Sequence, residues 1–570
     1  MAEVKEYELR LKDNITKDYI ASLSESVVHR VPSNDKLMIV NLTDLQYQRL
    51  LDRDLVDGIM STEEHDARIE NADVRSVSYY RHDPHAYSDW PDVDFNAQGN
   101  WGLIRHTNDT NNTSFDQQIT TDYTYNYTGI GVDLIVLAAD TFYIGEQDSE
   151  LRNSNGESKV KQFQWNTLPG LESLPDIDYN DIDGLPSNVK HAEAVTKIAA
   201  GNTYGWAPGV NIYIVPREKF LPTFWHECAK VFHNEKKAGN ITGVPSDRPT
   251  VLLSAYTYNK QFNERFMYSV KFRGQEETRR YGNNDISSIN SDKALPGYGV
   301  KRIFISPGID SNVYARADDV TSAGIINVVA AGNNNSKQCL PGNIDYNNYY
   351  KRYDSRGGSQ QVSSTEYYYN RPQPTAGADG LTSPTISCAA LASHFGFNTT
   401  VHGTSELLAE FSDKGNRIDC CAAGNNIPLR LAGTLDETDI ENGDRENFLA
   451  NGTSFAAPQI AGMACLVLQK YPTTTPMQMR KYFRDHAISS EKLYDTGLAP
   501  LSNTNHFGDS VYFDSTHGLQ GYSGNIAYLD PDLTFDPTTI SDTSIANEEV
   551  TAEGRLNFTI DEINTKLGTL

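Results

Sequence analysis

Ser454 is the side chain in this sequence best placed to do chemistry. It stands in the run NGTSFAAPQIAG, which continues as the almost wholly apolar MACLVLQKY and is predicted to form a buried helix. A hydroxyl at the start of such a helix lies near unpaired backbone N–H groups and the positive end of the helix dipole, where negative charge is stabilised. The position therefore suits a nucleophile, and it also suits a serine that only caps the helix.

Three more polar residues stand beside apolar segments. His191 opens a predicted helix (HAEAVTKIAAG), Asn333 follows a predicted strand (IINVVAAG), and Asp140 follows the short apolar run VDLIVLAA. Functional groups of open α/β sheets gather beyond the carboxyl ends of the strands, so Asp140 is a better candidate than Asp133, which lies near the amino end of that run. A surface histidine and an Asn-containing turn are the ordinary alternatives for His191 and Asn333.

The Ser454 run resembles the nucleophile segment of subtilisin-like serine peptidases, which carry Gly-Thr-Ser-x-Ala-Ala-Pro-x-x-Ala-Gly, and it has no departure from that pattern. The segment at His191 resembles the family's His-Gly-Thr-x-Val-Ala-Gly, with Ala192 and Glu193 in place of Gly and Thr. The Ala-Gly-Asn that ends at Asn333 matches as well. The order Asp, His, Asn, Ser is that of subtilisins and differs from that of chymotrypsin and the α/β-hydrolases.

The resemblance implies a serine endopeptidase acting on protein or peptide substrates. His191 takes the proton of the Ser454 hydroxyl, Asp140 orients the imidazole, and the Asn333 amide with the Ser454 backbone N–H holds the oxyanion. The strand VLLSAY, with Ser254 and Ala255 at its end, stands where the family binds the substrate main chain by strand addition.

Asp140 carries the least specific of these matches. The family strand ends in Asp-Thr/Ser-Gly, and this chain keeps Asp140-Thr141 but has Phe142 instead of Gly. The phase of the preceding Gly-Val places the family's Asp at Ala138, two residues earlier on the same side of the strand. These departures keep open a second interpretation, a catalytically weak or inactive structural or binding protein on a subtilisin scaffold.

Composition limits the partners and the compartment. A net charge of −26 without a basic patch argues against nucleic acid or an anionic membrane as the main partner. The N-terminal segment has no apolar core of a signal peptide and no run reaches transmembrane length, so we expect an intracellular or virion-associated protein. The six cysteines show no Cys-x-x-Cys spacing and are expected to be reduced and buried.

The predicted fold class is α/β, a subtilisin-like parallel sheet with helices on both faces. We divide the chain into a small α/β module over residues 1–95, a peptidase domain over 96–500 and an extension of unknown role over 501–570. Within the module, KLMIVNL is predicted to form a strand, TDLQYQRLLDRDLV a helix and VDGIMS a second strand. The stretch 337–385, rich in Tyr, Asn, Gly and Ser, is predicted to be a loop insertion. The module resembles the propeptides of the family, although an unrelated α/β adaptor has the same pattern. No cofactor is required by this chemistry, and structural calcium is implied by the resemblance without a matching ligand set. The histidines of WHECAKVFH lack the further ligands of a zinc site.

Overall fold

The computed structural model describes most of the chain, with gaps. The described residues are 4–12, 15–30, 36–61, 80–81, 100–107, 126–138, 149–153, 155–177, 189–216, 220, 222–257, 259–263, 267–272, 274–278, 303–307, 311–334, 336–343, 345–354, 361–362, 366–377, 382–392, 407–409, 411–431, 446–489, 494–495 and 525–543.

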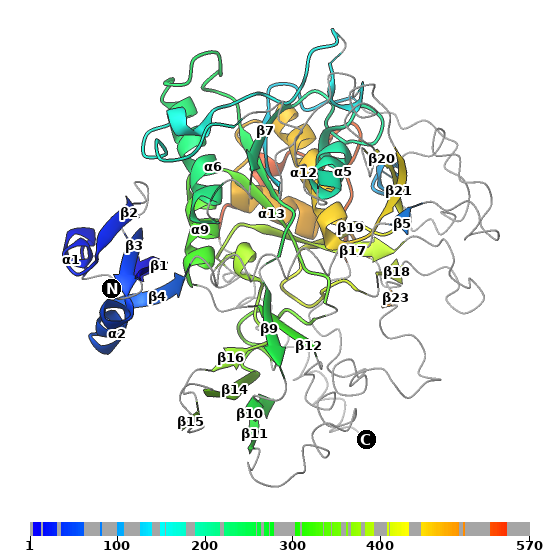
Figure 1. Ribbon diagram of the computed structural model, residues 1–570. Coiled ribbons are helices and arrows are strands. Elements are labelled where there is room, and N and C mark those ends of the chain that lie inside the picture. Colours follow the sequence, from blue (N-terminus) through cyan, green and yellow to red (C-terminus); the bar gives the residue numbers. More distant parts are fainter. Residues whose placement is uncertain are drawn as a thin grey trace, which may run out of the picture.

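A largely parallel sheet forms the centre of the molecule (Figure 1). Its main path runs β22-β24-β19-β17-β13-β8-β6-β7, and the neighbours from β24 to β7 are parallel. The parallel strands are β6 (Asp133–Ala138), β7 (Asn211–Pro216), β8 (Thr250–Ser254), β13 (Ile326–Ala330), β17 (Ile386–Ala392), β19 (Cys420–Ala423) and β24 (Asn525–Ile526). At the periphery lie β18 (Leu407–Leu408), β22 (Ile488–Ser489) and β23 (Tyr494–Asp495).

Helices cover both faces of this sheet because successive side chains of a strand point to opposite sides. On β8, Val251 and Leu253 belong to the core shared with α5 (Val189–Ala200) and α12 (Thr453–Lys470). Leu252 belongs to the core on the other side, with α6 (Pro222–Lys237) and α9 (Ser311–Ser322). Figure 1 shows the two helix layers on either side of the strands. The predicted fold class is confirmed.

The N-terminal segment forms its own antiparallel sheet, in the order β2-β3-β1-β4, with its own apolar core. Its elements are β1 (Val4–Leu11), α1 (Lys17–Ala21), β2 (Ser26–Arg30), β3 (Leu37–Thr43), α2 (Asp44–Asp52) and β4 (Val56–Ser61). The last three were predicted from sequence. This module contacts α9 through an ion pair between Glu8 and Arg316, both almost fully buried.

A smaller sheet stands apart from the central one and includes part of the stretch 337–385, for which the sequence predicted a loop. It contains β10 (Met267–Phe272), β11 (Gln275–Thr278), β14 (Tyr349–Asp354), β15 (Gln361–Val362) and β16 (Tyr367–Tyr368). The loop prediction is wrong because tyrosine favours strands, and cross-strand ring pairs such as Tyr350–Tyr367, stacked at 5.1 Å, stabilise the pairing.

The remaining elements are short. β9 (Asn259–Asn263) pairs with β12 (Ile303–Pro307), and β20 (Ile427–Leu431) pairs with β21 (Glu446–Ala450), which also pairs with β5 (Tyr80–Arg81). Short helices are α4 (Gly102–Arg105), α13 (Pro476–Asp485), η2 (Ser149–Leu151), η3 (Trp165–Thr167), η5 (Pro374–Ala376) and η7 (Pro537–Thr539). Part of the predicted 501–570 extension packs with the central sheet, since Ile526, Leu529 and Leu533 belong to its core.

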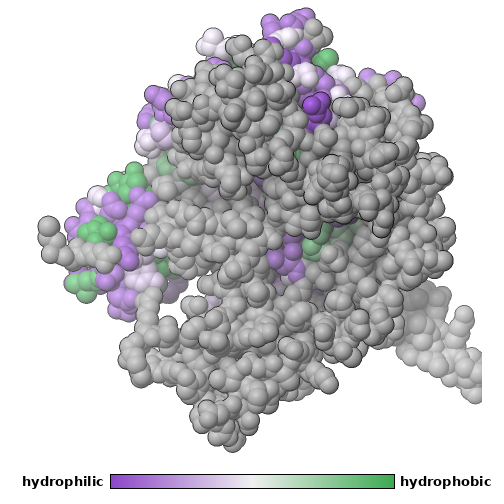
Figure 2. Space-filling model, turned by 45° about the vertical axis from the view of Figure 1, so that its right-hand side comes forward, coloured by the Kyte–Doolittle hydropathy of each residue, from purple (hydrophilic) through white to green (hydrophobic). Residues whose placement is uncertain are grey.

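The surface carries few large apolar side chains among the described residues. Five of the exposed ones, Val4, Tyr19, Val28, Leu45 and Leu51, lie on the N-terminal module. In Figure 2, green residues at that module are mixed with purple hydrophilic ones rather than joined into one apolar face. No helix in the described part of the chain combines the length and the apolar composition needed to cross a bilayer.

Candidate active site

The helix that begins with the Ser454 segment is the most deeply buried helix described. All residues of α12 from Thr453 to Leu468 are buried, and the helix packs on α5 and on the central sheet. At Gly462 an added Cβ would lie 2.7 Å from the Ala199 carbonyl oxygen and 2.5 Å from the Trp206 Cβ. The lack of a side chain at Gly462 thus lets α12 approach its neighbours closely.

Pro458 affects the first turns of this helix. It stands inside α12 and has no backbone N–H, so the carbonyl of Ser454 lacks the hydrogen bond that residue 458 would normally donate to it. Ser454 itself is 5% exposed in the first turn. Its hydroxyl is therefore held by a rigid, packed element, which is what a positioned nucleophile requires.

Asn333 is brought to the same place from the carboxyl end of β13. Its side-chain oxygen accepts hydrogen bonds from the Thr453 backbone N–H at 2.7 Å and from the Thr453 hydroxyl at 2.9 Å. The Thr453 hydroxyl also accepts from the Gly332 backbone N–H at 3.1 Å. The Asn333 Nδ2 lies beside Gly452, where an added Cβ would be 3.4 Å from it, so both ends of the amide lie against the Ser454 segment.

His191 reaches the site from the first turn of α5. Its ring lies 5.6 Å from the ring of Phe455, the residue that follows Ser454, and it is 7% exposed. The close packing of α5 against α12 sets this distance. The structure thus brings together the histidine, serine and asparagine segments that lie far apart in the sequence.

Glu193, one of the two departures from the family pattern, is held in an ion pair. Its carboxylate accepts from the Lys197 ammonium group at 2.6 Å, one helical turn further along α5, and Lys197 also donates to the Arg430 carbonyl at 2.7 Å. Both side chains are buried. The negative charge of Glu193 is therefore compensated within its own helix and tied to β20.

Asp140, the predicted partner of His191, lies outside the described residues. Asp133 lies at the amino end of β6 and is fully buried. Its carboxylate accepts from the Lys236 ammonium group at 2.7 Å and lies 3.7 Å from the Arg248 guanidinium. Asp133 thus belongs to an ion cluster at the sheet edge opposite to the carboxyl ends of the parallel strands.

The two predicted substrate-binding residues end strand β8. The Ser254 hydroxyl donates to the Asn327 side-chain oxygen at 3.3 Å inside the sheet, and both Ser254 and Ala255 are buried. Tyr256 packs edge-on against Trp225 at 5.3 Å. A substrate main chain can therefore form hydrogen bonds here only with the backbone of Ser254 and Ala255, and that role remains a prediction.

Sequence reasoning missed the polar contacts that hold the start of the domain against α12. Gln459 donates to the Asn100 side chain at 2.8 Å and accepts from it at 2.7 Å, and its oxygen also accepts from the Trp206 indole at 2.6 Å. His106 donates from Nδ1 to the Ala527 carbonyl at 2.7 Å, while its Nε2 accepts from the Ala423 N–H at 3.0 Å. An amide in an otherwise apolar helix was the available signal for Gln459.

The two histidines of α6, His226 and His233, are buried inside the domain and do not lie on its surface. Burial lowers the pKa of His226 to about 4, and neither of its ring nitrogens has a hydrogen-bond partner among the described residues. His233 accepts from or donates to the Thr250 hydroxyl at 2.8 Å. No group of three or more His, Cys, Asp or Glu side chains in the described part of the chain could hold a metal ion. All six cysteines are buried free thiols.

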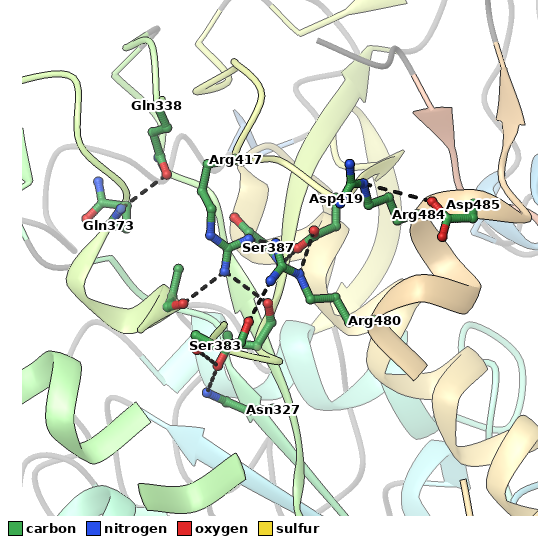
Figure 3. A network of polar contacts seen from close by, with 12 residues as sticks. Asn327, Gln338, Gln373, Ser383, Ser387, Arg417, Asp419, Arg480, Arg484 and Asp485 are labelled. Carbon is green, nitrogen blue, oxygen red and sulfur yellow. Dashed lines mark hydrogen bonds and ion pairs between the residues drawn. The ribbon is translucent and has the colours of Figure 1, made fainter. Parts of the chain in front are cut away.

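A second buried ion cluster fastens α13 to the sheet (Figure 3). The Asp419 carboxylate accepts from the Arg417 guanidinium at 2.8 Å and from Arg480 at 2.8 Å, and also from the Ser387 N–H at 2.9 Å. Arg480 donates in addition to the Ser383 carbonyl at 2.6 Å. Two arginines hold the pKa of Asp419 below its ordinary value against the opposing effect of burial. The cluster shapes the domain and carries no group of the candidate site.

Comparison with known proteins gives the family. The model of the Subtilase family matches residues 175–511, more than half of the chain. The chain belongs to the subtilase family. The matched range contains His191, Asn333 and Ser454 and begins after Asp140. Membership in this family supports a serine peptidase.

Individual relatives of the subtilase match over short stretches. Subtilisin BL from Lederbergia lenta is 35% identical over 92 residues, which are 16% of this chain and 30% of that relative. Subtilisin from Bacillus pumilus is 36% identical over 92 residues, again 16% of this chain and 30% of the relative. The matched part thus spans about 30% of the length of these curated relatives.

Solved structures align over longer ranges at low identity. The epidermin leader peptide processing serine protease from Staphylococcus aureus gives a TM-score of 0.45 at 14% identity, covering 95% of this chain and 100% of that one. Fervidolysin from Fervidobacterium pennivorans gives 0.41 at 15% identity, covering 88% and 62%.

Proposed function

We propose that this subtilase is a serine endopeptidase that hydrolyses peptide bonds through Asp140, His191 and Ser454, with Asn333 as oxyanion donor. The Ser454 hydroxyl attacks the scissile carbonyl while His191 accepts its proton, and the histidine then donates that proton to the leaving amine. Water then attacks the resulting acyl-enzyme. His191 accepts a proton from this water and returns it to the Ser454 oxygen as the acid product leaves. Asp140 holds the imidazole in the tautomer that can accept the proton and stabilises its charged form.

The observation that carries this proposal is the pair of hydrogen bonds from Thr453 to the Asn333 side-chain oxygen. They fix the orientation of the amide, whose Nδ2 lies beside Gly452, and the oxyanion of the tetrahedral intermediate would form next to this segment. A donor fixed in advance stabilises that charge without reorganising, an effect of about 3–4 kcal/mol for a single donor in known cases. An asparagine with only a turn-forming role would not need this orientation.

Hydrolysis of a fluorescein-labelled casein by the wild type, Ser454→Ala and the exposed-serine control Ser541→Ala tests the proposal. We expect the control to match the wild type and Ser454→Ala to lose turnover. Equal activity of Ser454→Ala and the wild type would refute the nucleophile. No activity in any of the three, with folded protein, would favour the alternative of an inactive scaffold that binds protein or peptide.

Three further expectations stay part of the proposal. The module within residues 1–95 acts as a propeptide, which its separate core and its ion pair with α9 support. Mass spectrometry of the purified chain tests this: cleavage near residue 95 in the wild type and not in Ser454→Ala is expected. The chemistry uses no cofactor, and structural calcium stays an expectation from the family resemblance; the described part of the chain holds no group of three or more His, Cys, Asp or Glu side chains that could bind a metal ion. We place the protein inside cells or virions, with protein or peptide as partner and neither nucleic acid nor membrane.

A further inference from the structure

Asp413 forms hydrogen bonds with the backbone on both sides of Asn333. Its Oδ1 accepts from the Asn334 N–H at 3.0 Å and from the Ser336 N–H at 2.8 Å, beyond the asparagine. Its own backbone N–H donates to the Gly332 carbonyl at 2.8 Å, before the asparagine. Asp413 is 1% exposed, so these bonds are shielded from water. Hydrogen bonds from N–H groups to a charged carboxylate are stronger than those to a neutral acceptor, so these bonds restrain the loop.

The second carboxylate oxygen of Asp413 is tied to another element. Its Oδ2 accepts from the Gln338 side chain at 3.1 Å, and the same NH₂ group donates to the Ala331 carbonyl at 2.5 Å. The backbone N–H of Gln338 donates to the Lys414 carbonyl at 2.6 Å. Gln338 thus links the end of β13 to the segment of Asp413 and Lys414, and its hydrogen bonds complete those that surround the asparagine loop.

Gly332 shows that the loop is shaped around this carboxylate. Its φ is +125°, a backbone conformation that side chains disfavour, and an added Cβ would lie 2.3 Å from the Asp413 Oδ2. The carboxylate therefore occupies the space that a side chain at position 332 would need. The glycine, the aspartate and the asparagine form one packed unit, and both the Asn333 side chain and the Gly332 N–H contact Thr453, next to Ser454.

We propose that Asp413 is a positioning residue for the oxyanion donor. It fixes the backbone before and after Asn333, while Thr453 sets the orientation of the amide, so the NH₂ group is held where the oxyanion develops. Asp413 acts through Asn333 and touches no substrate. The inference rests on the proposed peptidase function, because only a reaction with an oxyanion makes this position matter for rate.

The test is a double-mutant cycle with Asp413→Asn and Asn333→Ala. The Asn side chain has the shape of Asp but turns an NH₂ group either toward the N–H groups of Asn334 and Ser336 or toward the amide of Gln338. We expect kcat to fall about 10- to 100-fold with KM changed less than about twofold, a part of the loss expected for the donor itself. In the Asn333→Ala background, the same substitution should change kcat less than about twofold, because the group it positions is gone.

Two controls separate this role from a general effect on folding. Asp345→Asn breaks a buried ion pair with Lys337, at 2.7 Å, and should leave kcat per labelled active site unchanged. If Asp413→Asn does not fold, Gln338→Met removes the bond to Oδ2, and its smaller loss of kcat should also vanish in the Asn333→Ala background. An equal loss in both backgrounds, or a wild-type kcat for the variant, overturns the inference while the peptidase function stands. A wild type without Ser454-dependent hydrolysis overturns both.

Discussion

Acidification from pH 7 to pH 5 is expected to destabilise the fold, because it contains histidines that are buried in the neutral form. The pKa of His106 is lowered to about 3, mainly by burial and further by the neighbouring charge of Arg105. Burial lowers the pKa of His226 to about 4. Burial together with Lys236 lowers that of His233 to about 3.

The direction and the size of the effect follow from these values. An unfolded histidine titrates near pH 6.5, so below that pH the unfolded chain binds protons that the folded chain does not. The stability contributed by each neutral histidine is therefore complete above pH 6.5 and lost as the pH falls toward 3 or 4. Between pH 7 and pH 5 each histidine removes about 2 kcal/mol from the free energy of unfolding. The summed loss from the three histidines is comparable to the free energy of unfolding of a typical domain, about 5–15 kcal/mol.

Urea unfolding followed by tryptophan fluorescence at pH 7, 6 and 5 measures the effect, with Ser454→Ala as parent to prevent self-digestion. His106→Asn on this parent gives the comparison: the amide can still donate to the Ala527 carbonyl, but it does not titrate. The variant should be less stable at pH 7 and should lose about 2 kcal/mol less on acidification to pH 5. Carboxylates titrate equally in both proteins. The same pH dependence in both would refute the reasoning.

Three other substitutions test the site and its surroundings. Asn333→Ala should lower kcat about 10²- to 10³-fold with little change in KM, measured on a peptide anilide; a loss confined to KM would mean that Asn333 only shapes the cleft. Asp140→Asn should keep the fold, checked by circular dichroism, and cut kcat about 10⁴-fold; a variant as active as the wild type would show that His191 has another partner or none. Asp133→Asn should leave kcat almost unchanged but lower the unfolding free energy by about 3–5 kcal/mol, because the Lys236 ammonium group stays buried without its anion; unchanged urea unfolding would contradict this.

The sheet and its helices could be predicted from sequence because their signals are local. Short apolar runs mark the strands β6, β8 and β13, and the small residues of α12 mark a helix that packs closely. The four candidate residues, Asp140, His191, Asn333 and Ser454, were proposed in the same way, from motifs a few residues long. In physical terms, the spacing of apolar residues within a segment determines which face of the strand or helix is buried.

The contacts that fix the site could not be predicted, because they join residues far apart in the chain. Asn333 and Thr453 are separated by 120 positions, and Asn100 and Gln459 by 359. The hydrogen-bond partner of a buried amide depends on which strands become neighbours. The position of Asp413 beside Gly332 likewise follows only from the packing of the two loops.

The prediction of a loop over residues 337–385 was wrong for a different reason. Asn, Gly and Ser favour turns when they are considered one at a time, but the tyrosines of β14 and β16 face one another across strands. The Tyr349–Tyr368 pair, at 5.6 Å, and the Tyr350–Tyr367 pair stabilise these strands through side chains that only meet once the sheet has formed.

The most direct test of the account is covalent labelling by a fluorophosphonate probe, followed by mass spectrometry of the labelled peptide. The account predicts one stoichiometric adduct on Ser454 in the wild type, a much slower reaction in His191→Ala, and no adduct in Ser454→Ala. A wild type that is folded and unlabelled, or a label on another serine, would contradict the claim that Ser454 is an activated nucleophile.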